Sequence, residues 1–234
     1  YRRALLVDGS DETATAIRAL TESGEVSPVS LTHAVTAVYQ MAGPQALQRL
    51  VAARARGRGK LLWRQIAGLG DSEVDGTNPM IMEPDLVSGI SYGELGYAHD
   101  PDGLPLDPVE PFAAHSDEEF IGEPVSLPQE LPHFEWPTAV ITCDRDLITP
   151  PPIGARIAAL IPDAVLVPLT ETGHSALDSH RGAALAITRA VRDGACDELR
   201  ARAEELSTLP RQGSLHAMST AIRVGVAVGS HLPF

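Results

Sequence analysis

Apolar residues recur along this chain with two different spacings, and the spacing predicts where helices and strands lie. Between Ser30 and Arg64 the spacing is helical, with one stripe made of Leu31, Val35, Val38 and Tyr39. Pro44 is expected to open a second helix, because proline suits the first helical turn. Two or three helices with no strand between them indicate an insertion packed over a sheet.

From Pro137 onward, short β-branched runs alternate with helical stretches. Four elements are predicted there, in the order strand, helix, strand and helix: 138–142, 153–160, 164–169 and 181–191. Short connections between alternating strands and helices are typical of parallel strands in an α/β sheet. In such sheets ligands bind beyond the carboxyl ends of the strands.

The two ends of the chain are expected to be mostly helical. Ala4–Val7 is a short apolar run predicted as a strand, and a helix follows through Leu20, with Ser10 as its expected N-cap. At the other end, helices are predicted over 197–206 and 215–228, folded back on the body.

Four segments are therefore predicted. They are a strand and helix of the core, a cap or lid with an irregular loop region, the C-terminal part of the core, and a helical tail: 1–29, 30–136, 137–195 and 196–234. The stretch 68–137 is rich in Pro, Gly and Asp and shows little sustained period. A long irregular stretch of this kind is usually functional or mobile.

The charge and the composition limit which binding partners and which location are expected. The net charge is −13, and a field of that sign repels phosphate backbones, so nucleic acid is not expected to bind. The one basic cluster is expected to be a solvated helix face: Arg54, Arg56, Arg58, Lys60 and Arg64. No window is apolar enough to cross a membrane. Two cysteines suggest no disulfide framework, so a reducing, cytoplasmic location is expected.

Two residues near the predicted strand ends carry candidate chemistry. Asp146 follows the strand 138–142, and His174 follows Gly173 after the strand 164–169. A carboxylate that orients an imidazole lets the imidazole act as a base near neutral pH. Such a pair needs a nucleophile as its third member.

Residues 138–193 resemble the C-terminal portion of the α/β-hydrolase superfamily. The family's glycine-x-x-aspartate-x-x-x-proline turn is matched from Cys143 to Pro150, with Cys143 in place of the glycine. The resemblance implies that Asp146, rather than Asp144, is the catalytic acid and that His174 is the general base. It also implies that the helices of 30–64 are a cap inserted after the sixth strand, which Ala4–Val7 would form.

The nucleophile is harder to locate. Gly89-Ile90-Ser91-Tyr92-Gly93 fits the glycine-x-serine-x-glycine pattern, and Ser91, Asp146 and His174 stand in the right chain order. However, that nucleophile must follow a buried strand and start a helix, and neither is evident around Ser91. The chain also begins at Tyr1 rather than at methionine. An N-terminal hydrolase segment, upstream or on another polypeptide, is therefore expected to supply the nucleophile and the oxyanion hole.

The expected function is hydrolysis of an ester, amide or related acyl bond in a small-molecule or peptide substrate, as in esterases, lipases and peptidases. Members of the superfamily with an aspartate nucleophile act on epoxides or haloalkanes, and these residues leave that chemistry open. No cofactor and no metal are expected, because the histidines are scattered and no phosphate-binding glycine loop appears. The alternative is a non-catalytic binding or scaffold module, which the replacement at Cys143 and the unlocated nucleophile favour.

Overall fold

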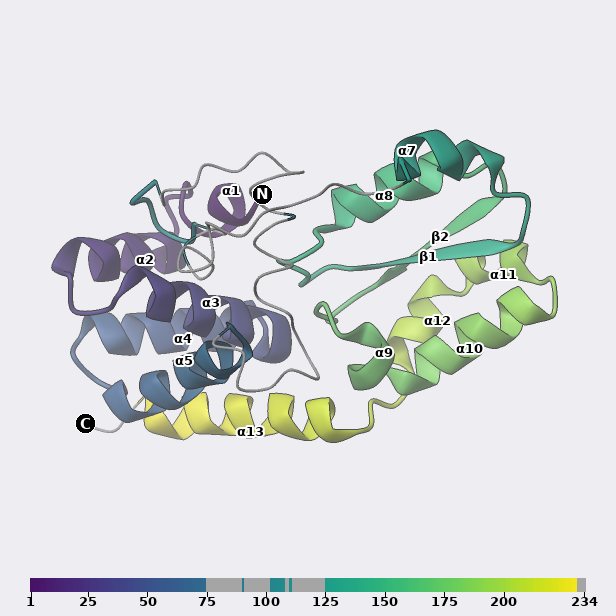
Figure 1. The fold of residues 1–234 in the computed structure, drawn as a ribbon. Coiled ribbons are helices and arrows are strands. Elements are labelled where there is room, and N and C mark those ends of the chain that lie inside the picture. The colour runs from purple at the N-terminus through teal and green to yellow at the C-terminus, as the bar shows by residue number, and fades with distance from the viewer. Residues whose placement is uncertain (75–89, 91–101, 108–109, 111–124, 231–234) are drawn as a thin grey trace. The chain divides into compact units, whose positions relative to one another are not determined.

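The computed structural model describes residues 1–74, 90, 102–107, 110 and 125–230 (Figure 1). It divides the chain into two units. The first takes its described residues from Tyr1–Val38, Pro44–Glu123 and Ile222–Phe234, and the second from Tyr39–Gly43 and Pro124–Ala221. The long helix α3 begins in the first unit, and its last residues belong to the second.

The first unit is helical wherever it has regular structure among its described residues. Its helices are α1 (Arg2–Leu6), α2 (Glu12–Ser23), most of α3 (Pro28–Ala42), α4 (Pro44–Ala55), α5 (Lys60–Val74) and the second half of α13 (Ser214–Gly229). The predicted stripe is buried: Leu31, Val35, Val38 and Tyr39 are each at most 8% exposed. Burial of such a stripe stabilises the helices mainly through the hydrophobic effect.

The second unit is built around a parallel pair of strands. Its elements are α7 (Leu127–Glu130), η3 (Leu131–His133), β1 (Thr138–Cys143), α8 (Pro151–Leu160), β2 (Ala164–Leu169), α9 (Ala176–Ser179), α10 (Arg181–Arg192), α11 (Cys196–Ala201) and α12 (Ala203–Thr208). β1 and β2 pair from Thr138 with Ala164 through Cys143 with Leu169. The predicted parallel strands and the broad α/β class are thus confirmed.

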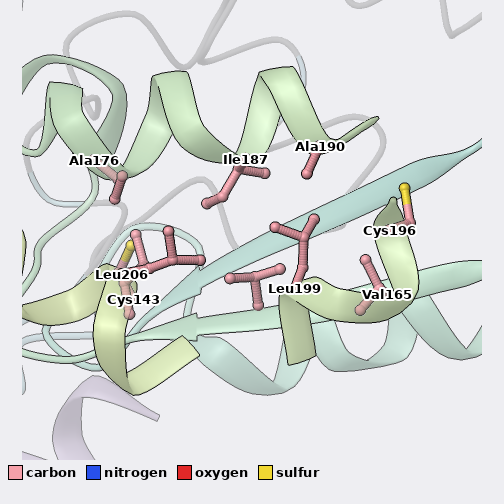
Figure 2. Close-up of a cluster of buried hydrophobic side chains, with 11 residues drawn as sticks. Cys143, Val165, Ala176, Ile187, Ala190, Cys196, Leu199 and Leu206 are labelled. Atoms are coloured by element: carbon pink, nitrogen blue, oxygen red, sulfur yellow. The ribbon is translucent and has the colours of Figure 1, made fainter. Parts of the chain in front are cut away.

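Helices lie on both faces of this sheet (Figure 1). Successive side chains of a strand point to opposite faces, so each strand packs against helices on both sides. On one face, Cys143, Val165 and Leu169 join buried residues of the helices that follow β2. Figure 2 shows this core, in which Ile187 of α10 and Leu199 of α11 point toward one another. On the other face α8 lies so close that a Cβ on Gly154 would come within 2.4 Å of the Thr142 methyl carbon.

Helix α8 is nevertheless thinly covered. None of its residues is buried, and Ile153 and Ile157 are 46% and 36% exposed. The sheet face under α8 is therefore less well enclosed than the face that packs on α10, α11 and α12. Buried parallel sheets normally have both faces covered.

The strand predicted over Ala4–Val7 is wrong. Residues 2–6 form helix α1, in which Leu5 N–H donates to the carbonyl of Tyr1 and Val7 N–H to that of Arg3. A four-residue apolar run does not distinguish a strand from one helical turn. The expected cap is also wrong, because Asp11 rather than Ser10 caps α2.

The predicted helical stretch 197–206 is divided into α11 and α12, and Leu199 and Leu206 are fully buried in the core beside β2. One further expectation is corrected by packing. Arg54 is not on a solvated face but is 6% exposed, and its guanidinium pairs with the Glu25 carboxylate at 2.9 Å. This error arises because burial depends on tertiary neighbours. Among the described helices, none has the length and apolar character that a bilayer crossing requires.

Candidate functional site

The turns that follow β1 and β2 lie side by side at the carboxyl edge of the sheet. The last paired residues of the two strands are Cys143 and Leu169, and Asp144 N–H donates to the Leu169 carbonyl at 3.1 Å. Parallel pairing brings the two carboxyl ends to the same edge, so residues far apart in sequence become neighbours.

Two more hydrogen bonds join these turns at Thr172, which is 1% exposed. Its N–H donates to Asp144 Oδ1 at 3.1 Å, and its carbonyl accepts from Arg145 N–H at 3.0 Å. Asp144 therefore connects the turn after β1 to the loop before His174. The two aspartates of this turn therefore have different partners, Thr172 for Asp144 and His174 for Asp146.

Asp146 uses its two carboxylate oxygens for different contacts. Oδ1 accepts the backbone N–H groups of Ile148 and Thr149 at 2.8 and 2.9 Å. Oδ2 accepts the Thr149 hydroxyl at 2.9 Å and lies 3.1 Å from His174 Nδ1. The Asp146 side chain is 8% exposed, so the carboxylate has little contact with water. Oδ1 fixes the turn, and Oδ2 is left to orient the imidazole.

The hydrogen-bond partners determine the tautomer of His174. A carboxylate can only accept, so Nδ1 must carry the proton that it shares with Asp146. The Thr149 hydroxyl lies 3.2 Å from the same nitrogen, and its own proton goes to Asp146. In the neutral ring, Nε2 then carries the lone pair that can accept a proton. This is the tautomer that a general base requires. The His174 side chain is 46% exposed.

The pKa values of the pair move in opposite directions. Burial raises the pKa of Asp146, but the hydrogen bonds from His174, Thr149 and Ile148 outweigh it and hold that pKa below its ordinary value. The hydrogen bond to Asp146 raises the pKa of His174, against a smaller opposing effect of burial. Each partner therefore stabilises the charged form of the other.

The loop before His174 is held by two arginines. Glu171 has a positive φ of 53°, which is uncommon for a residue with a side chain. The guanidinium of Arg211 donates to the carbonyls of Glu171 and of Thr170, the latter at 2.9 Å. Arg145 lies 3.5 Å from the Glu171 carboxylate, so it pairs with Glu171 rather than with its neighbour Asp146.

Cys143 cannot serve as the missing nucleophile. Its thiol is 4% exposed and packs in the core beside β2. Burial, followed by the charges of Asp146 and Asp144, raises the pKa of Cys143 to about 12. A thiol with that pKa carries almost no thiolate at neutral pH.

The structure thus brings together both predicted residues, Asp146 and His174. It does not identify the nucleophile, which is the third member of the predicted set, among the described residues. Ser91 lies outside the described residues. Within the described part of the chain, His174 Nε2 has no hydrogen-bond partner, and no group of three or more His, Cys, Asp or Glu side chains is arranged to hold a metal ion.

Sequence reasoning missed two contacts of this site. Thr149 precedes the proline of the turn motif and bonds both members of the pair, so its place in the motif was an available signal. Gln40 accepts the backbone N–H of His174 at 2.9 Å from 134 residues away, and no sequence pattern indicates that contact.

Comparison with known protein families, with characterised proteins and with solved structures finds no match to this chain.

Proposed function

We propose that this chain carries the acid and the base of a hydrolase of the α/β-hydrolase type, which acts on an ester, amide or related acyl bond. One observation carries the proposal: Asp146 Oδ2 lies 3.1 Å from His174 Nδ1, at the carboxyl ends of two parallel strands. The imidazole is half-exposed, and its basic nitrogen Nε2 has no hydrogen-bond partner among the described residues. In this chemistry that nitrogen takes the proton from a hydroxyl nucleophile.

In this proposal His174 acts twice. Its Nε2 first takes the proton from the nucleophile as that group attacks the acyl carbon, and then gives the proton to the leaving group. Asp146 holds the Nδ1–H tautomer and stabilises the imidazolium between the two steps. Thr149 holds the Asp146 carboxylate in place through its hydroxyl.

The nucleophile and the oxyanion hole are proposed to lie outside the described residues. They belong either to the stretch around Ser91 or to an N-terminal hydrolase segment, upstream or on a second polypeptide. The small sheet favours the second arrangement, because the described residues form two strands where sheets usually have four to six. A purified chain that is monomeric, cooperatively folded and stable with nothing else present would contradict that arrangement.

Substitution of the histidine tests the proposal. The full chain, with any polypeptide that co-purifies, is assayed against p-nitrophenyl esters and aminoacyl p-nitroanilides. His174→Ala is expected to lower kcat by about 10³-fold or more, because the nucleophile loses its base. His133→Ala is the matched control, since His133 is exposed and lies in the same unit.

The rival function is a non-catalytic binding or scaffold module with this fold. It is favoured by Cys143, which replaces the motif's glycine, and by the open Nε2 position among the described residues. In that case His174→Ala leaves any residual turnover equal to that of the His133→Ala control.

A further inference from the structure

The backbone of His174 is held by a side chain from a distant helix. His174 N–H donates to Gln40 Oε1 at 2.9 Å, and Gln40 lies in the last turn of α3. The segment Tyr39–Gly43 belongs to the same unit as the strands and the His174 loop. The imidazole is thus fixed from one side by Asp146, while the main chain that carries it is fixed by Gln40.

Gly173 shows how closely the two segments approach. A Cβ at Gly173 would lie 2.8 Å from Gln40 Cβ, 2.9 Å from its carbonyl oxygen and 3.2 Å from its carbonyl carbon. Two of these three atoms are backbone, which cannot move aside as a flexible side chain can. The glycine before the histidine is therefore required by space, because the loop lies against the main chain of α3.

The Gln40 hydrogen bond is made to the backbone of His174, and only a few covalent bonds separate that backbone from the imidazole ring. A shift of the His174 backbone changes the direction of its Cα–Cβ bond and moves the ring nitrogens on both sides. Nδ1 then loses its alignment with Asp146, and Nε2 moves from the position where it meets a nucleophile. Misplacement by about 1 Å is enough to lower a rate on the order of 10²-fold.

We propose that Gln40 is a positioning residue for His174, which holds the histidine backbone so that the ring meets Asp146. The amide oxygen supplies the acceptor, and Gly173 supplies the room for the approach. The consequence for turnover rests on the proposed hydrolase function, whereas the consequence for the His174–Asp146 contact does not.

Nuclear magnetic resonance of the full ¹⁵N-labelled chain tests the contact directly. Gln40→Met removes the acceptor at similar length, and Gln40→Glu keeps it. The ring signals of His174 are identified by their loss in His174→Gln and are followed with pH. In Gln40→Met the pKa of His174 is expected to fall toward its ordinary value of about 6.5, and the His174 amide is expected to exchange faster with solvent.

Gln40→Glu is expected to retain the slow amide exchange, because its carboxylate accepts the same hydrogen bond. Gly173→Ala is a second test, in which the added Cβ pushes the loop from Gln40 and acts in the same direction as Gln40→Met. Gln129→Met is the matched control: Gln129 is exposed in the same unit and is expected to leave the His174 titration unchanged. Circular dichroism checks that each variant folds.

The result that overturns the proposal is a folded Gln40→Met or Gly173→Ala chain whose His174 titrates and exchanges as in the wild type. On an ester substrate, Gln40→Met is expected to lower kcat 10- to 100-fold with KM unchanged. If the wild type shows no turnover while Gln40→Met still alters the His174 titration, the positioning role stands and the hydrolase proposal fails.

Discussion

Two histidines of the second unit show how surroundings decide the chemistry of one residue type. His180 is fully buried, and its pKa is lowered because burial disfavours the charged ring. Its Nε2 lies 3.0 Å from the Leu209 carbonyl, and its Nδ1 has no partner among the described residues. His174 is half-exposed, and its pKa is raised by Asp146. The His174 ring can therefore exchange protons with its surroundings, whereas the His180 ring fills the core.

The pH dependence of activity should report the state of His174. A base must be neutral to accept a proton, and Asp146 raises the pKa of His174, so kcat/KM is expected to fall as the pH drops through a value above about 6.5. Asp146→Asn removes the charge that stabilises the imidazolium, and the remaining activity should show this acid limb at lower pH. An acid limb that stays in place in Asp146→Asn would contradict the assignment of His174 as the titrating group.

The same pair also links the stability of the fold to pH. The contribution of Asp146, whose pKa is lowered, is present above about pH 3.9 and is lost as the pH falls through its folded-state pKa. The contribution of His174, whose pKa is raised, is present below about pH 6.5 and is lost as the pH rises through its folded-state pKa. Both contributions are fully present between about pH 3.9 and 6.5.

At the scale of elements, local patterns predicted the second unit well. The β-branched strands and the helices between them have bounds close to those expected, because each pattern is long enough to select one period. The meeting of Asp146 and His174 also followed from the sequence, since parallel strands bring their carboxyl ends to one edge. The run Ala4–Val7 was too short to decide between strand and helix.

Other features depend on tertiary neighbours and could not be predicted locally. The buried Arg54 pairs with Glu25, which lies 29 residues earlier in the sequence, and Gln40 contacts His174, which lies 134 residues later. Neither contact leaves a periodic signal, because each depends on how separate helices and loops pack.

Helix α8 should be sensitive to added volume at its contact with β1. Gly154→Ala places a Cβ 2.4 Å from the Thr142 methyl carbon and 3.5 Å from a Val140 methyl carbon. This overpacking is expected to reduce the free energy of unfolding by about 1–3 kcal/mol. The measurement is urea unfolding followed by circular dichroism.

Gly182→Ala is the matched control for that change. Gly182 lies in α10 of the same unit, and its added Cβ meets neighbours at 3.6 Å or more, which is ordinary contact. The control should unfold at a urea concentration equal to or above that of the wild type. Equal destabilisation by both variants would show that the α8 contact has no special role.

At the scale of the whole molecule, the described residues of the chain include the hydrogen-bonded Asp146–His174 pair at the edge of a small two-stranded sheet. The net charge of −13 disfavours a nucleic acid partner, and it does not distinguish one acyl substrate from another. The central claim is therefore about the pair and the nucleophile that it activates.

Labelling with a fluorophosphonate tests that claim most directly. The full chain and anything that co-purifies are treated, and intact mass and peptide mapping locate the adduct. The account predicts a serine adduct outside the described residues, at Ser91, in an upstream N-terminal segment of the full protein or on a second polypeptide, that forms about 10³-fold more slowly in His174→Ala. Absence of any adduct, or an adduct that forms at the same rate in His174→Ala, would contradict the account.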